Sequence, residues 1–383
     1  MKKTVCIILI ITFLLVPLNS CGEIEIVELN ERLIIEAIGI DKENGKYNVT
    51  IEGLDSYTAG SDSNSVSGEE LTKCYLFEGE TIGMAMNSIS VITGQIPLFS
   101  QARVLIIGRD TATNFLSEAL DFFRREYTTR TDILIAVADG KASDIVSADF
   151  GKNVSAGKIL ESALKSYKHT GTSVYIPLYK FLNNAMNESD AAYCPLLTVK
   201  DNEYTKKKDV KILGTVVIGK NSDTVLSPEQ TQSLTIINND TENGDMTIET
   251  EKGKCTLEII DSISKIKTEI INEKTVFDIK TKIKCDIPEF QSETFSGLSK
   301  SDTEKIAEIA AKKLTSMISD TITEFYIDKN FDIFNFNRRI NLADNRFYSE
   351  QLNKGGNFGK LSVFNISVEV SVRRIGKVVL EKE

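Results

Sequence analysis

The chain has 383 residues, of which 41% are hydrophobic and 26% are charged. This length allows two or three folded domains, and the composition excludes a disordered or fibrous protein. The formal net charge of −10 argues against nucleic acid as a partner, because phosphate groups repel an acidic surface.

The first 20 residues are typical of a secretory signal. Lys2 and Lys3 precede an apolar stretch from Val5 to Leu18, which is shorter than the roughly 20 residues that a spanning helix needs. We therefore expect residues 1–20 to be removed and the mature chain to lie outside the cytoplasm without a transmembrane helix.

The sequence Leu18-Asn19-Ser20-Cys21 resembles the lipobox of bacterial lipoproteins. Its cysteine would carry an S-diacylglyceryl group and an N-acyl group, and stable anchoring needs more than one acyl chain. Four glutamates follow within ten residues, so no basic segment would assist the lipid anchor. The alternative is that Cys21 is an ordinary structural cysteine.

Residues 33–54 predict a β-hairpin, because Asn44-Gly45 separates two strand-like runs. After a polar loop at 56–70, residues 74–150 alternate short apolar strands with helical segments, and another helix is expected at 157–171. This alternation predicts a sheet with helical cover. We assign residues 21–198 to an N-terminal α/β domain.

Residues 199–252 are expected to form a small middle domain. The hydrophilic stretch 199–211 suggests a connection between domains, and 212–219 predicts a strand. Ser227 is expected to cap a helix that has Pro228 at its first position. Asn243-Gly244 predicts a tight turn, and an EF-hand at 239–250 is disfavoured because Thr250 occupies the position of the bidentate glutamate.

Residues 253–383 predict a C-terminal α+β domain. Segments 255–271 and 274–287 alternate as antiparallel strands do, and residues 363–376 form a last strand. Ser301 and Glu304 predict a capping box ahead of a long helix. That helix carries an apolar stripe comprising Ile306, Ala310, Leu314, Met317, Ile318, Ile322 and Phe325. The overall expectation is a mixed α/β, three-domain protein whose last domain is an antiparallel sheet covered by one long helix.

No catalytic, cofactor-binding or metal-binding residue is expected. The sequence has no GxSxG elbow, P-loop or GxGxxG fingerprint, and its single histidine, His169, is interpreted as a solvated helix-end residue. Beyond the leader and Cys21 the cysteines are Cys74, Cys194, Cys255 and Cys285. They are either buried free thiols or include one disulfide, for which Cys255 and Cys285 are the favoured pair. The basic clusters 205–209 and 372–376 are interpreted as solvated surface, with partner docking as the alternative for Arg373 and Arg374.

The order of these segments resembles the Ger(x)C family, the lipoprotein C subunits of bacterial spore germinant receptors. The resemblance is carried by Cys21 with "EIVELNERLIIEAIGID", "ARVLIIG", "LDFFRREYTTRTDILIAVADGKASDIV", "LGTVVIG", "LSPEQTQSL", "FDIFNFNRRI" and "VEVSVRRIG". It implies a three-domain, non-enzymatic protein without a cofactor, lipid-anchored on the outer face of the spore inner membrane. Its implied partners are two integral-membrane subunits of a nutrient receptor.

The chain departs from this family in places. Gly22-Glu23 stands where Trp-Asp usually follows the cysteine, and the whole chain has no tryptophan. Two alternative functions are also compatible with the sequence. A lipid-anchored solute-binding protein of a transporter would show two similar lobes around a cleft, and a secreted hydrolase would need a nucleophile or metal constellation.

Overall fold

A computed structural model describes residue 28 and the ranges 31–54, 72–125, 129–151, 154–166, 171–186, 191–219, 222–241, 243–292, 298–376 and 378–379. The predicted signal at 1–20, Cys21 and His169 lie outside these residues. Across the described ranges, no helix combines the length and apolarity needed to cross a membrane.

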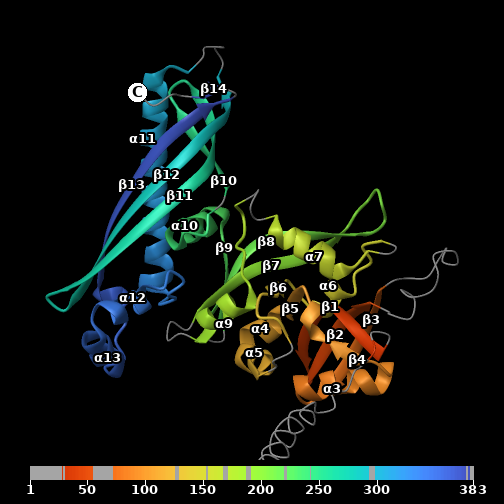
Figure 1. The fold of residues 1–383 in the computed structure, drawn as a ribbon. Coiled ribbons are helices and arrows are strands. Elements are labelled where there is room, and N and C mark those ends of the chain that lie inside the picture. Colours follow the sequence, from red (N-terminus) through yellow and green to blue (C-terminus); the bar gives the residue numbers. More distant parts are fainter. Residues whose placement is uncertain are drawn as a thin grey trace, which may run out of the picture.

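The first of two sheets has nine strands and occupies the N-terminal half (Figure 1). Its strands are β1 (Arg32–Glu43), β2 (Lys46–Leu54), β3 (Thr72–Gly79), β4 (Ile96–Leu98), β5 (Val104–Gly108), β6 (Leu134–Ala138), β7 (Ala192–Asp201), β8 (Lys208–Gly219) and β9 (Ser222–Leu226). The order is β3-β2-β1-β5-β6-β7-β8-β9, with β4 pairing with β1. Strands β1, β5, β6 and β7 run parallel, and the outer pairs are antiparallel.

Helices cover both faces of this sheet, which explains why β5 and β6 are buried throughout. One face packs against α3 (Ile82–Thr93), α5 (Leu116–Arg125) and α9 (Leu178–Met186). The opposite face packs against α6 (Ala142–Val146) and α7 (Ala156–Lys165). The short helices α4 (Arg109–Asn114) and η3 (Phe99–Gln101) adjoin β5. The predicted sheet with helical cover is confirmed.

Turns decide how the first sheet is connected. The predicted β1–β2 hairpin is confirmed, with Asn44 and Gly45 both at positive φ, 53° and 81°. The hydrophilic stretch 199–211, which suggested a connection between domains, instead forms the facing ends of β7 and β8 and the turn between them. Its polarity reflects a hairpin that extends beyond the helical cover into solvent.

Helix α10 (Pro228–Asn238) lies between the two sheets (Figure 1). Ser227 caps it with Pro228 at its start, as predicted, and Gln230 completes a capping box. The expected tight turn at Asn243-Gly244 is wrong. The chain leaves the helix through Asn239 at positive φ, and Gly244 already belongs to β10, so this segment connects a helix to a strand.

The second sheet consists of β10 (Gly244–Thr250), β11 (Gly253–Ile271), β12 (Lys274–Gln291), β13 (Ser362–Ile375) and β14 (Val378–Val379), in that order. Its strands pair antiparallel as expected, except that β13 runs parallel to β12. A parallel neighbour needs a long crossover, and the helices between residues 300 and 361 supply it.

Helix α11 (Lys300–Ile322) continues into a π-helical segment (Thr323–Asp328) and lies along this sheet (Figure 1). The predicted stripe is confirmed, since all its members are buried except Met317, which is partly buried. The predicted capping box is displaced by two residues. Ser299 caps the helix and Asp302 returns the bond, because the helix begins at Lys300. A long helix over a mostly antiparallel sheet confirms the fold class.

Helices α12 (Phe336–Ala343) and α13 (Asn345–Asn353) lie near the lower end of α11 (Figure 1). The short η5 (Gly359–Leu361) leads directly into β13. Phe336 of α12 is fully buried, with ring centroids 4.7 Å from Phe277, 5.0 Å from Tyr326 and 5.1 Å from Phe364. This aromatic cluster joins strands β12 and β13 to the C-terminal helices.

Candidate functional site

The strand β1 is where the fold begins after Cys21. Ten residues, 22–31, separate Cys21 from Arg32, the first residue of β1. Arg32 pairs with Ile96 of β4, which directly follows α3. The start of β1 and the short strand β4 form one end of the first sheet, next to the end of α3. This end is the part of the fold closest in sequence to the expected anchor.

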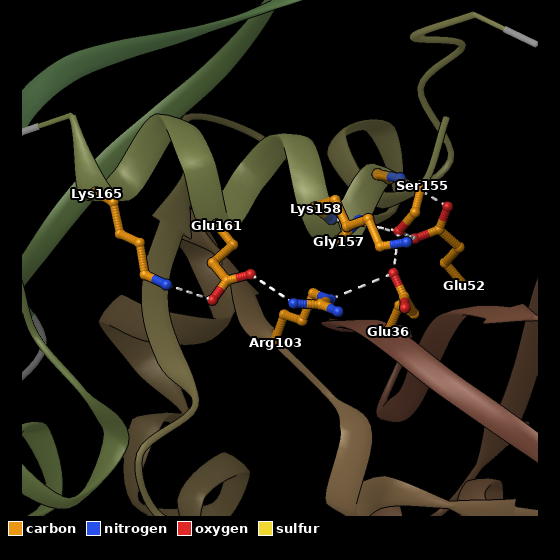
Figure 2. Close-up of polar contacts among 9 residues, drawn as sticks. Glu36, Glu52, Arg103, Ser155, Gly157, Lys158, Glu161 and Lys165 are labelled. Atoms are coloured by element: carbon orange, nitrogen blue, oxygen red, sulfur yellow. Dashed lines mark hydrogen bonds and ion pairs between the residues drawn. The ribbon is translucent and has the colours of Figure 1, made fainter. Parts of the chain in front are cut away.

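Two glutamates are buried together next to this end of the sheet. Glu36 of β1 and Glu52 of β2 flank the hydroxyl of Ser155, whose Oγ lies 2.5 Å from Glu36 Oε2 and 3.0 Å from Glu52 Oε2 (Figure 2). Ser155 is also the N-cap of α7. The hydroxyl group of Ser155 therefore connects β1 and β2 to α7, although Ser155 follows Glu52 by 103 residues.

The carboxylate of Glu52 binds the N-terminus of α7. It accepts hydrogen bonds from the backbone N–H groups of Ala156 at 2.7 Å and Gly157 at 2.8 Å. A carboxylate at this position satisfies free helical donors and interacts favourably with the helix dipole. The helix approaches β1 so closely that a Cβ on Gly157 would lie 2.5 Å from the Glu36 carbonyl oxygen. Only glycine fits at this contact.

Arg103 compensates the negative charge of this cluster. Its Nε lies 3.4 Å from Glu36 Oε2, and its Nη1 donates to Glu161 Oε2 at 2.8 Å (Figure 2). Glu161 in turn pairs with Lys165 at 2.6 Å. The hydrogen bond to Glu161 is the main cause that raises the pKa of Arg103. We define Glu36, Glu52, Arg103, Ser155 and Glu161 as the α7 clamp.

The donors and acceptors of the α7 clamp are directed at one another. Both oxygens of Glu52 are taken by fixed backbone donors, which leaves this carboxylate poorly suited to accept a substrate proton. No group of histidine, cysteine and acidic residues that could hold a metal occurs among the described residues. The cluster positions α7 against the first two strands.

A crevice of about 610 Å³ lies at the opposite end of the first sheet, outside the carboxyl ends of β1, β5 and β6. Ligands of α/β proteins commonly bind at such an edge. Arg109 lines this crevice, and it donates to Asp223 at 2.7 Å and to Asp139 at 2.5 Å. Asp41 accepts from the backbone of Ala142 at 2.8 Å, and burial raises its pKa. Arg109 is therefore neutralised by two carboxylates, and the oxygens of Asp41 are taken by backbone donors.

Among the described residues, no disulfide forms between Cys74, Cys194, Cys255 and Cys285. Cys255 and Cys285, the pair considered for a disulfide, are not opposite each other on β11 and β12. Cys285 pairs with Ile259, which is four residues beyond Cys255 on β11. Burial raises the pKa of Cys255 to about 11 and that of Cys285 to about 12. Neither is a reactive thiolate at neutral pH.

The basic clusters are placed on the surface. Lys207 pairs with Asp149 and Lys208 with Asp201 near the β7–β8 turn. Arg373 donates twice to Asp286, at 2.9 and 2.7 Å, and this bond lowers the pKa of Asp286. Arg374 lies 3.2 Å from the same carboxylate.

Sequence reasoning missed the buried acids. Glu36 interrupts the apolar run of β1, and a charge inside such a run signals a buried partner. Asp332, in the segment between α11 and α12, accepts from the backbone N–H groups of Phe336 at 2.8 Å and Asn337 at 2.7 Å. Burial raises the pKa of Asp332 to about 6.

Together, these features define a mixed α/β protein in which a sheet covered on both faces is joined to a sheet covered on one. The chain belongs to the spore germination protein family. Residues 25–199 match the family described as "Spore germination protein N-terminal domain", and residues 213–376 match "Spore germination B3/ GerAC like, C-terminal".

Named relatives agree with this assignment. The chain is 26% identical over 319 residues to "Spore germination protein B3" of Bacillus subtilis (strain 168), covering 82% of each chain. It is 22% identical over 202 residues to "Spore germination protein GerQC" of Bacillus cereus, covering 53% of each. The crystal structure of the GerBC protein has a similar fold, with a TM-score of 0.51 and 18% identity over 88% of this chain and 96% of that one.

Proposed function

We propose that the protein is a non-enzymatic, lipid-anchored subunit of a spore germinant receptor, required for the germination response to nutrients. Cys21 would carry the lipid and hold the chain on the outer face of the spore inner membrane. The observation that carries the proposal is the match of both family domains, in order, over most of the chain.

Two features of the fold support a role in assembly rather than chemistry. The buried acids of the α7 clamp are bonded to fixed donors, and Arg109 in the 610 Å³ crevice is paired with Asp139 and Asp223. The partners would be integral-membrane subunits of the receptor, which this subunit would stabilise or bias between signalling states by contact. The protein would act without a cofactor and without binding nucleic acid.

The experiment is nutrient germination of spores that carry Cys21→Ala as their only copy of this protein. We expect the variant to leave the membrane fraction and the spores to lose most of their nutrient response. Cys74→Ala is the matched control, because it removes an exposed thiol within the folded part of the chain. A normal response of Cys21→Ala spores to every nutrient tested would refute the proposal.

A solute-binding protein of a transporter is the alternative function. It requires two similar lobes, whereas the two sheets here differ in strand number, pairing and helical cover. Titration calorimetry of the protein with amino acids and sugars tests this alternative. Micromolar binding of a solute without any effect of the protein on germination would favour it.

A further inference from the structure

We infer that the end of the first sheet nearest to Cys21 inserts an apolar patch into the surface of the lipid bilayer. The patch consists of Val91 and Ile92 at the end of α3 and Ile96 of β4. These side chains are 85%, 64% and 45% exposed. The inference rests on the proposed lipid anchor and adds a second, non-covalent contact with the same membrane.

The local structure explains why these residues are exposed. Helix α3 buries Ala85, Met86 and Ile89 against the sheet. It ends at Gly94, whose positive φ of 71° turns the chain into β4. Val91 and Ile92 therefore lie at the end of the helix beyond its packed face, and Ile96 follows within five residues.

The surrounding segment is also uncharged. Residues 81–102 contain no aspartate, glutamate, lysine or arginine, although 26% of the chain is charged. Inserting this segment into the boundary between headgroups and acyl chains would bury no ionised side chain of its own. Surface segments that lie in the membrane interface bury apolar side chains to a depth of roughly 5–10 Å.

The position of the patch favours lipid as its occupant. Ile96 pairs with Arg32, where β1 begins. The chain from Cys21 to Arg32 can span at most about 40 Å, even when fully extended. A lipid on Cys21 would therefore keep this end of the sheet close to the bilayer.

Two other exposed apolar residues, Tyr204 and Ile263, lack this combination. Tyr204 is 95% exposed, but it lies in the β7–β8 turn beside charged neighbours. Ile263 lies opposite Lys282 on the open face of the second sheet. Scattered apolar residues of this kind are ordinary on protein surfaces, whereas a concentrated patch indicates a contact.

The absence of tryptophan permits a direct test with the full chain. Ile92→Trp and Tyr204→Trp each introduce a single tryptophan at an exposed position. Each lipidated protein would be reconstituted into phosphatidylethanolamine and phosphatidylglycerol vesicles with or without bromine on the acyl chains. We expect bromine to reduce the emission of Ile92→Trp to roughly half, since the side chain would lie at acyl-chain depth, and to leave Tyr204→Trp unchanged.

The membrane insertion of the patch would be refuted if Ile92→Trp emitted equally with and without bromine while the protein still floated with the vesicles. The proposed lipid anchor would be unaffected by that result. A blue shift that needs added spore-membrane proteins and occurs without bromine quenching would assign the patch to a protein partner and also overturn it. The patch is supported independently if Ile92→Trp in a Cys21→Ala chain is still quenched, even though the proposed anchor is gone. Val91, Ile92 and Ile96 would then be changed to serine in the Cys21→Ala chain. A several-fold loss of cosedimentation with the vesicles would support the insertion of the patch.

Discussion

The two sheets of this protein bury their side chains in different ways. The first is covered by helices on both faces, and it encloses the polar α7 clamp between β1, β2 and α7. The second is covered on one face only, and the aromatic cluster around Phe336 lies in its interior. Apolar side chains pack the helices against the sheet in both parts of the molecule. In the part built on the first sheet, the first unit, long-range polar bonds also hold α7 to β1 and β2. In the part built on the second sheet, the second unit, aromatic packing joins the C-terminal helices to the strands.

The open face of the second sheet shows what one-sided cover permits. Lys280, Lys282 and Lys284 project from β12 toward solvent, and the residues between them are buried. This alternation is typical of an antiparallel sheet with one wet face. Changes on that face should be tolerated, whereas changes inside either unit should not be.

The largest effect is expected in the aromatic cluster. Phe336→Ala removes a fully buried ring that contacts Phe277, Tyr326 and Phe364, which should lower the free energy of unfolding by about 4 kcal/mol. Leu342→Ala, on the exposed side of the same helix, should change it by less than about 0.5 kcal/mol. Urea unfolding followed by circular dichroism measures both. Similar values for the two variants would contradict the apolar account of the second unit.

The next effect tests the polar account of the first unit. Glu52→Ala would leave the N–H groups of Ala156 and Gly157 without their acceptor in a buried site, and we expect a loss of about 3 kcal/mol. Hydrogen exchange should accelerate first in α7. Glu78→Ala, which removes an exposed carboxylate paired with Lys46, is the matched control and should cost less than about 1 kcal/mol. Unchanged exchange in α7 would show that the clamp does not hold this helix.

The sequence predicts features that depend on neighbours along the chain. The Asn44-Gly45 hairpin and the apolar stripe of α11 are local patterns, and both are confirmed. The parallel pairing of β13 could not be predicted, because its alternation is the same in either direction. The α7 clamp joins Glu52 to Ser155, which are 103 residues apart in the sequence. A pattern of neighbouring residues cannot predict a contact between such distant positions. Lipid attachment at Cys21 stays a prediction.

The buried Asp332 should make the stability of the protein depend on pH. Its pKa of about 6 in the folded protein lies above the ordinary value of 3.8, because burial disfavours the charged form. The folded state therefore binds the proton more tightly, and this residue's contribution to stability decreases as pH rises from about 4 to about 6. Asp332→Asn should lack this decrease, so its stability relative to the wild type should rise by about 2 kcal/mol across that window. Asp320→Asn, on α11, is the control, and parallel pH profiles for Asp332→Asn and the wild type would contradict the assignment.

The smallest effect concerns the start of α11, where two serines precede acids by three residues. Ser299 accepts the N–H of Asp302, and Asp302 accepts the N–H of Ser299, whereas Ser301 already lies inside the helix. Ser299→Ala should therefore cost about 1 kcal/mol, and Ser301→Ala should change stability by less than about 0.5 kcal/mol. Thermal unfolding of the two variants in parallel measures the difference. The reverse order would restore Ser301 as the cap and would shorten the helix that covers the second sheet.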